Sequence, residues 1–411
     1  MRILFLSHYF PPEVNAPAIR THEHARRWVA DGHEVTVITG VPNHPKGELF
    51  PGFENRWIQE EAVDGIRVIR TWMYLTPNAG FLRRSANYVL FMATAILAAP
   101  RAGRPDVVIA TSPQFFCGLA GRVVAWIKRR PFVLEVRDLW PDSIVQLGQL
   151  RQSQLIRALE ALETRLYHSA RLIVVNTRAF IEHIAGRGIP RERIELVYNG
   201  IDPDLFQPRP ADEDLRREHG FEGKFVVTYM GTLGLAHGLT TVLEAAERLR
   251  DEPAFHFLLI GDGAERERLE RQIAERSLGN VTLVGLRPRA EVPAWIASSD
   301  ALLVMLRDLP VFQTVVPSKM FEFLAQERPL IMAAPRGGEC RALLEDAKAG
   351  FVLDAEDPDA LADAIRFVHD QPEEAAERAR AGRAWVLGDF VRDDLARRML
   401  ESVRAAIGAT G

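Results

Sequence analysis

Short apolar runs rich in β-branched residues recur along the first 200 residues, and longer mixed stretches separate them. Uninterrupted apolar runs of this length are typical of strands buried on both faces of a parallel sheet. Strands are predicted at residues 2–6, 35–39, 66–71, 106–111, 132–136 and 172–176. The stretches between them favour crossover helices, predicted at 16–31, 82–99, 115–129, 153–169 and 178–187. This alternation predicts a doubly wound α/β domain.

The same alternation restarts after a proline-rich segment. Pro203, Pro208 and Pro210 lie there without a periodic apolar pattern, as expected at a domain boundary. Further strands are predicted at 225–230, 256–260, 281–284, 301–306, 330–334 and 351–353, with helices in the gaps. We therefore expect two Rossmann-like doubly wound parallel-sheet domains. They would face each other across a central cleft, the place where open α/β sheets bind ligands.

The composition excludes a disordered or fibrous chain, because 47% of the 411 residues are hydrophobic. Residues 1–200 carry 25 Lys and Arg against 18 Asp and Glu, whereas residues 201–411 carry 26 against 37, so a basic half precedes an acidic one. The apolar start is expected to be a strand and not a secretory signal, and the longest uncharged apolar stretch, 88–100, is too short to span a bilayer. Cys117 and Cys340 cannot form a disulfide framework, which fits a reducing compartment.

Five motifs occur in order along the chain: SHYFPPE at 7–13, VRDLWPDS at 136–143, YNGIDPDLF at 198–206, GDG at 261–263 and PSKMFEFLA at 317–325. With this order and spacing the chain resembles the retaining glycosyltransferases of family 4, which have the GT-B fold, and especially their bacterial branch in O-antigen, capsule and colanic-acid biosynthesis. The resemblance implies an acceptor-binding domain at 1–200 and a nucleotide-sugar-binding domain at 201–385. It also implies a C-terminal helix at 386–411 that packs back onto the first domain.

The PSKMFEF segment is the strongest candidate site. Pro317 and Ser318 mark a helix start, where backbone N–H groups and the positive end of the helix dipole stabilise a phosphate. Lys319 and Glu322 share a helix face, so an ordinary surface salt bridge is the alternative. The resemblance implies that Glu322 accepts hydrogen bonds from both ribose hydroxyls of the donor.

The chain departs from the family pattern at three positions of this domain. Thr314 stands where the family commonly has a glutamate that contacts the transferred sugar. In GTLGLAHG, Thr232 and His237 stand where an Arg and a Lys usually hold the diphosphate. A diphosphate still needs positive charge or N–H donors. The expected substitutes are Lys319, the backbone around Gly231 and Gly234, Arg307, and His237 if it is protonated.

The Gly261-Asp262-Gly263 turn follows a predicted strand. A dinucleotide fingerprint would need a third glycine where Arg266 stands, so NAD binding is not expected. The turn is either purely structural or, as the resemblance implies, lines the nucleotide pocket together with the Leu286 and Arg287 backbone near the base.

Two loops of the first domain carry further candidates. Asn15 and Ala16 stand where family members often have two glycines close to the donor phosphates. VRDLWPDS lies at the carboxyl end of a strand, and the resemblance implies that Arg137 lies near the reacting sugar while Asp138 and Asp142 hold hydroxyls. A structural ion pair between Arg137 and Asp138 is the alternative, and neither aspartate is expected to be a general base.

The short match Asp202-Pro203-Asp204 resembles a metal-diphosphate motif of another glycosyltransferase fold, but its position favours a linker turn. No ligand cluster has credible spacing, so we expect an enzyme without metal and without a separate cofactor.

The segment 81–99 is apolar and carries Arg83 and Arg84 at its start, which is typical of a helix that lies in an anionic membrane interface. A buried crossover helix is the alternative. Nucleic acid is not expected as a partner, because no recognition module accompanies the basic half.

Together with these features, the resemblance implies transfer of a sugar from a nucleotide donor, expected to be UDP-linked, to a hydroxyl of a lipid-linked saccharide. The expected location is the cytoplasm, peripheral on the inner face of the membrane. Two other functions stay open: a nucleotide-sugar epimerase of the same architecture, and a non-catalytic partner subunit.

Overall fold

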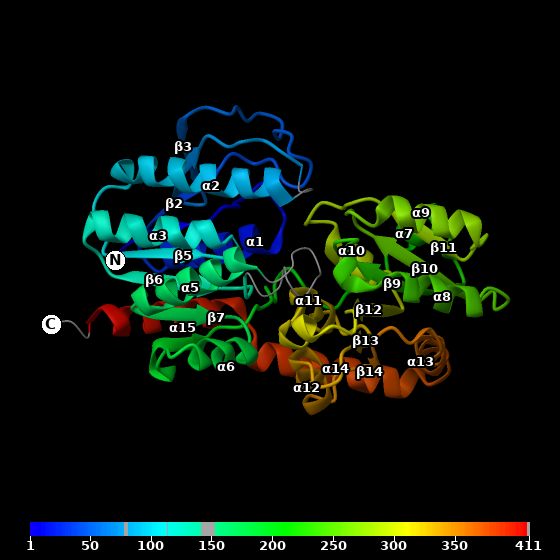
Figure 1. Cartoon of the computed structure of the whole chain (residues 1–411). Helices are drawn as coiled ribbons and strands as arrows, with labels where there is room; N and C mark the ends of the chain where they lie inside the picture. The colour runs from blue at the N-terminus through cyan, green and yellow to red at the C-terminus, as the bar shows by residue number, and fades with distance from the viewer. Residues whose placement is uncertain (78–80, 113, 141–152, 409–411) are drawn as a thin grey trace. The chain divides into compact units, whose positions relative to one another are not determined.

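The computed structural model describes residues 1–77, 81–112, 114–140 and 153–408 (Figure 1). The chain forms two compact units. Met1–Tyr198 and Arg392–Gly411 make up unit 1, and Asn199–Val391 make up unit 2. Unit 1 is therefore built from two separate stretches of chain.

Unit 1 contains a sheet of eight strands within its described residues, in the order β3-β4-β2-β1-β5-β6-β7-β8. All neighbours are parallel except β3 and β4, which are antiparallel. Its elements are β1 (Arg2–Leu6), α1 (Ala16–Ala30), β2 (Glu34–Gly40), β3 (Ile58–Val63), β4 (Ile66–Thr71), α2 (Phe81–Ala98), η1 (Ala99–Ala102), β5 (Val107–Thr111), α3 (Phe115–Lys128), β6 (Phe132–Val136), α5 (Gln154–Ser169), β7 (Leu172–Val175), α6 (Arg178–Gly186), η2 (Arg191–Arg193), β8 (Ile194–Leu196) and α15 (Arg392–Gly408).

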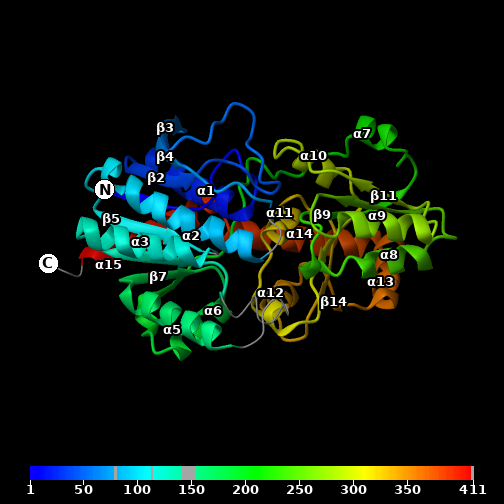
Figure 2. The ribbon, with the colours of Figure 1, turned by 45° about the horizontal axis from the view of Figure 1, so that its top comes forward.

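Both faces of this sheet are covered, and alternate residues of a strand serve opposite faces. Leu4 and Leu6 pack with residues of α2, α3, α5 and α6, whereas Ile3 and Phe5 pack with residues of α1 and α15. The two views in Figures 1 and 2 show α2 and α3 side by side on one of these faces. On the other face the indole Nε1 of Trp28 donates to the Ala396 carbonyl oxygen at 2.9 Å. The last helix of the chain therefore belongs to the core of unit 1.

Unit 2 contains a parallel sheet of six strands in the order β11-β10-β9-β12-β13-β14. Residues of α8, α9 and α13 pack on one of its faces. The elements are α7 (Glu213–Glu218), β9 (Phe225–Met230), η3 (Leu235–His237), α8 (Thr240–Arg248), β10 (Phe255–Ile260), α9 (Arg266–Glu275), β11 (Val281–Val284), α10 (Val292–Ala297), β12 (Ala301–Met305), η4 (Pro310–Thr314), α11 (Ser318–Ala325), β13 (Leu330–Ala334), α12 (Glu339–Asp346), β14 (Phe351–Asp354), α13 (Pro358–Asp370) and α14 (Pro372–Asp389).

The predicted α/β fold class is confirmed, and every predicted strand forms within one residue of its expected bounds. Two strands were missed. β3 is a half-exposed edge strand with the sequence IQEEAV, so it lacks the apolar run that marks a buried strand. β8 has only three residues, which is too short for a pattern.

Candidate active site

The strand order of each sheet reverses at one point, and the predicted site residues gather near these points. In unit 2 the chain moves from β9 to β10 and β11 on one side and then to β12, β13 and β14 on the other, so the reversal lies between β9 and β12. Open α/β sheets bind ligands beside the carboxyl ends of the strands at such a point. The loop after β9 and the N-terminus of α11 both lie there.

Lys319 lies in the first turn of α11, with its ammonium group in a hydrophobic setting. Its Nζ is shielded from water, has no hydrogen-bond partner among the described residues, and lies 4.0 Å from the centre of the Tyr229 ring. A Cβ atom built on Gly231 would lie 2.7 Å from this Nζ, so the ammonium sits directly over the glycine backbone. Burial lowers the pKa of Lys319 from 10.5 to about 7, and the Glu322 carboxylate only partly opposes this shift. When it is protonated, Lys319 thus places a positive charge at a helix N-terminus, and no group among the described residues hydrogen-bonds to it.

The helix start adds N–H donors to this charge. Pro317 is the N-cap of α11, and no side chain caps the helix. The first-turn N–H groups, including that of Ser318, therefore have no side-chain acceptor from the cap position, and a phosphate oxygen is a suitable one.

The surroundings of His237 disfavour its charged form. Its Nδ1 lies 3.0 Å from the Met305 carbonyl oxygen, and burial together with the nearby Lys319 lowers its pKa to about 3. In this structure the imidazole therefore favours its neutral form, and the expectation that it is protonated beside a diphosphate stays a prediction. Arg307, another expected substitute, donates from Nε to Glu356 at 3.1 Å and so already has an anionic partner.

The GDG turn fits against the loop after β9 because its two glycines have no side chains. A Cβ on Gly261 would lie 1.8 Å from the Gly231 carbonyl oxygen, and one on Gly263 would lie 2.4 Å from that of Leu233. The Leu233 N–H donates to the Asp262 carbonyl oxygen at 2.9 Å. The turn therefore fixes the course of the loop that carries Gly231 and Thr232.

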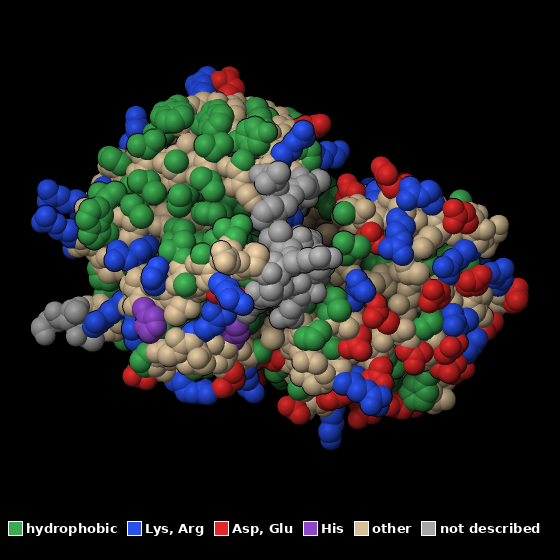
Figure 3. Space-filling view, in the orientation of Figure 1, with side chains coloured by type: hydrophobic (Ala, Val, Ile, Leu, Met, Phe, Trp, Pro, Cys, Tyr) green, Lys and Arg blue, Asp and Glu red, His purple; other side chains and the backbone are tan. Residues whose placement is uncertain are grey.

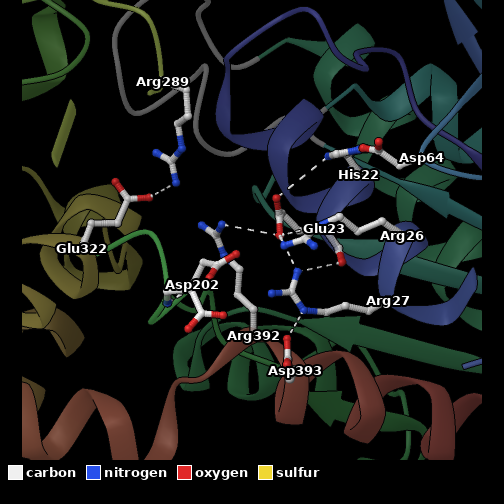
Figure 4. Close-up of polar contacts among 11 residues, drawn as sticks. His22, Glu23, Arg26, Arg27, Asp64, Asp202, Arg289, Glu322, Arg392 and Asp393 are labelled. Atoms are coloured by element: carbon white, nitrogen blue, oxygen red, sulfur yellow. Dashed lines mark hydrogen bonds and ion pairs between the residues drawn. The ribbon is translucent and has the colours of Figure 1, made fainter. Parts of the chain in front are cut away.

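Glu322, on α11, is buried and bound by an arginine of unit 2. Nη2 of Arg289 donates to Oε1 of Glu322 at 2.7 Å (Figure 4). The Arg289 guanidinium also lies 4.9 Å from the centre of the Phe206 ring. The expected alternative, a surface salt bridge between Lys319 and Glu322, is wrong, because the Lys319 Nζ and the Glu322 side chain are both shielded from water and this Nζ makes no hydrogen bond to any described residue. Sequence reasoning missed Arg289, since nothing in a pattern pairs two residues 33 positions apart.

The remaining candidates of unit 2 make contacts with residues near them in the chain or lie exposed. The Thr314 hydroxyl donates to the Val311 carbonyl oxygen at 2.8 Å, and the Thr232 carbonyl oxygen accepts from the Tyr229 hydroxyl at 2.8 Å. Leu286 is exposed, and Arg287 lies 5.1 Å from the centre of the Trp295 ring.

In unit 1 the reversal of strand order lies between β1 and β5, and Asn15, Ala16 and Arg137 come together there. Asn15 caps α1 by accepting from the Ala18 N–H at 3.0 Å, and the Arg137 Nη1 donates to the Ala16 carbonyl oxygen at 3.3 Å. The Arg137 N–H also donates to the Ser112 hydroxyl at 2.8 Å. Burial lowers the pKa of Arg137 to about 10, although Glu135 favours the charged form. Asp138 follows on the same loop, and Asp142 lies outside the described residues.

A buried ion pair that the sequence did not indicate lies beneath this loop. The Arg20 Nε donates to Glu135 at 2.7 Å, and its other nitrogens donate to the carbonyl oxygens of Val197 and Tyr198. Burial would raise the pKa of Glu135, but Arg20 and Arg137 outweigh it and hold the pKa at about 2. The pair links α1 and β6 to the last residues of unit 1 before the chain enters unit 2.

Across the described ranges no three His, Cys, Asp or Glu side chains come close enough together to hold a metal ion. Within the same ranges, no helix has both the length and the apolar character that crossing a membrane requires.

Two doubly wound α/β units in one chain are the architecture of the GT-B class of glycosyltransferases. Residues 15–200 match the family model described as "Glycosyl transferase 4-like domain", and residues 211–385 match that described as "Glycosyl transferases group 1". The chain belongs to the glycosyltransferases of family 4.

Similar proteins cover almost the whole chain. WcaI of Escherichia coli K12, named as a glycosyl transferase of colanic acid biosynthesis, is 27% identical over 84% of this chain and 86% of its own. The GDP-mannose-dependent alpha-mannosyltransferase of Mycobacterium tuberculosis is 28% identical over 94% of this chain and 93% of its own. The crystal structure of Anabaena HepE in complex with UDP-glucose shares the fold, with a TM-score of 0.72, 19% identity and coverage of 98% of this chain and 100% of HepE.

Proposed function

We propose that this enzyme transfers a sugar, with retention of the anomeric configuration, from a UDP-sugar to a hydroxyl of a lipid-linked glycan in surface polysaccharide synthesis. The observation that carries the proposal is the buried ammonium of Lys319, which has no hydrogen-bond partner in the part of the chain that the structure describes and lies over Gly231 at the start of α11. Holding such a charge is costly for the empty protein. A diphosphate at this position would stabilise the ammonium and accept from the N–H groups of α11.

In this proposal the donor nucleotide spans unit 2 from Lys319 to Glu322. The diphosphate lies against Lys319, Ser318 and the Gly231 backbone, and the ribose hydroxyls donate to Glu322. Carboxylate oxygens are suited to this role because they accept more than one hydrogen bond. Thr232, Thr314 and the GDG turn line the sugar end, and the backbone of 286–287 lies near the base.

Uracil is the base we propose, because the fold neighbour HepE is described with UDP-glucose. The mycobacterial relative is named for GDP-mannose. A donor screen that measures release of UDP or GDP separates the two, and release of GDP alone would refute the uracil assignment.

The proposed chemistry needs little covalent help from the protein. The acceptor oxygen bonds to the anomeric carbon as the bond to the β-phosphate breaks, and the departing phosphate takes the acceptor proton on the same face. The protein's contribution is then positioning and charge stabilisation. Arg137 would act at the reacting sugar, and Asp138 and Asp142 would hold hydroxyls.

The Glu322→Ala variant tests the donor site. Loss of a charged hydrogen bond should weaken UDP binding by roughly tenfold to a hundredfold, measured by calorimetry. Glu373→Ala, an exposed position in the first turn of α14, is the matched control and should bind as the parent does. Equal affinity of both variants for UDP would remove Glu322 from the site. Epimer formation from donor alone would instead indicate the epimerase, and a chain that binds no nucleotide would indicate a partner subunit.

The lipid-linked acceptor rests on a second observation, the outward faces of α2 and α3. Figure 3 shows hydrophobic side chains gathered over these two helices, with Lys and Arg along the margins. Trp126 is 71% exposed, and Leu97 and Ile127 are also exposed. Residues 65–134 carry ten Lys and Arg and a single acidic residue, Asp106, which pairs with Arg2. An apolar face with basic margins is complementary to an anionic bilayer.

Sedimentation with vesicles of mixed phosphatidylglycerol and phosphatidylcholine tests this attachment. We expect the parent to sediment, and variants Trp126→Ser and Arg129→Glu/Arg130→Glu to stay largely in the supernatant. Trp57→Ser, which removes an exposed tryptophan beside β3, is the control and should sediment like the parent. Equal sedimentation of all four proteins would refute attachment through α2 and α3.

A further inference from the structure

The ion pair between Arg289 and Glu322 occupies the carboxylate to which the proposed function assigns the ribose. The Arg289 Nη2 lies 2.7 Å from Oε1 of Glu322, and the two side chains are 28% and 11% exposed. Arg289 comes from the loop between β11 and α10, so it lies on a different segment from the helix that carries Glu322. The arginine therefore occupies a site that the nucleotide also needs.

A ligand can displace Arg289 from Glu322 at little cost. The guanidinium rests 4.9 Å from the centre of the Phe206 ring, which gives it a second favourable surface besides the carboxylate. A partly exposed ion pair is worth little, so a ligand with two hydroxyls can displace it. The ion pair still lowers the apparent affinity for the nucleotide, in proportion to the fraction of molecules in which Arg289 occupies Glu322.

We propose that Arg289 competes with the ribose for Glu322 and by this competition speeds the release of the nucleoside diphosphate product. The inference rests on the proposed function, because it takes Glu322 as the ribose-binding carboxylate. When the ribose leaves, Arg289 takes its place on Glu322, so the buried carboxylate regains the Arg289 hydrogen bond seen in this structure. The residue thus sets how long UDP stays bound and does not take part in the chemical step.

A double-mutant cycle with UDP as the probe tests this competition. Arg289→Met should tighten UDP binding about twofold to fivefold, mostly through a slower dissociation rate seen in stopped-flow measurements. UDP should inhibit turnover more strongly by the same factor. Arg289→Lys keeps the charge and should restore most of the parental behaviour. Inorganic pyrophosphate, which has no ribose, should bind the parent and Arg289→Met equally.

The Glu322→Ala background completes the cycle. There Arg289 has no carboxylate to occupy, so Arg289→Met should give no further gain in UDP affinity. Weaker or unchanged UDP binding by Arg289→Met in the parental background would overturn the inference, and a weakening by Glu322→Ala would then leave the proposed function standing. If Glu322→Ala itself leaves UDP binding unchanged, the ribose assignment fails and the inference fails with it.

Discussion

The Lys319→Met variant should make the empty protein more stable and the nucleotide complex weaker. Burial lowers the pKa of Lys319 from 10.5 to about 7. At about 1.4 kcal/mol per pH unit, keeping this ammonium charged costs roughly 4 to 5 kcal/mol. Methionine has a similar volume and no charge, but it loses the contact with the Tyr229 ring. We therefore expect a net gain of about 1 to 3 kcal/mol in the free energy of unfolding at pH 7.

Differential scanning calorimetry of the empty protein measures the first effect. At roughly 2 to 4 °C per kcal/mol, the transition should rise by several degrees. Titration calorimetry with UDP measures the second, and the loss of a charge-assisted contact with the diphosphate should weaken binding by about tenfold to a hundredfold. Lys348→Met, at an exposed position of unit 2, should change neither quantity.

A single pair of results would refute the reasoning: a lower transition temperature together with unchanged UDP affinity. Lys319 would then be a structural residue whose charge is compensated by the protein, and the diphosphate would have to lie elsewhere.

Three further predictions follow from the same site. Because a bound diphosphate favours the charged form, the pKa of Lys319 should rise from about 7 when UDP binds. UDP affinity should therefore fall as the pH rises above 7, and UDP binding should take up protons. Calorimetry in two buffers of different ionisation enthalpy measures this proton uptake, and equal heats would contradict it. Gly261→Ala should destabilise unit 2 by about 2 to 4 kcal/mol, since the new Cβ would lie 1.8 Å from the Gly231 carbonyl oxygen. Gly279→Ala is the control, because a Cβ at that position meets only open space. Urea unfolding compares the two variants, and equal midpoints would contradict the steric argument. Sugar transfer should run at full rate in excess EDTA, because in our proposal Lys319 and α11 supply the positive potential at the diphosphate. A loss of activity in EDTA that Mg²⁺ restores would contradict this prediction.

The fold could be predicted because buried parallel strands leave a strong mark on the sequence. A strand such as β5 is apolar on both faces, so its run of residues is visible without knowledge of its neighbours. The edge strand β3 has one partner and a half-exposed surface, and its Gln and Glu residues give no such run.

The candidate site could be predicted only as far as local geometry reaches. The start of α11 follows from Pro317 and Ser318, which lie next to each other in the chain. The partners of the site's charged groups depend on distant segments: Arg289 reaches Glu322, Arg20 reaches Glu135, and burial makes His237 neutral. A pKa and an ion pair are properties of the packed structure, and no spacing rule contains them.

Because α15 packs in unit 1, unit 1 can complete its core only after all of unit 2 has been synthesised. Unit 2 is one continuous stretch, so it can fold as soon as residues 199–391 have left the ribosome. One layer of the unit 1 core, by contrast, needs residues of α15, which is synthesised after unit 2. These residues are Leu395, Met399 and Leu400. Until that helix has been synthesised, the sheet face around Phe5 lacks one of the two helices that cover it, and its apolar residues are open to water.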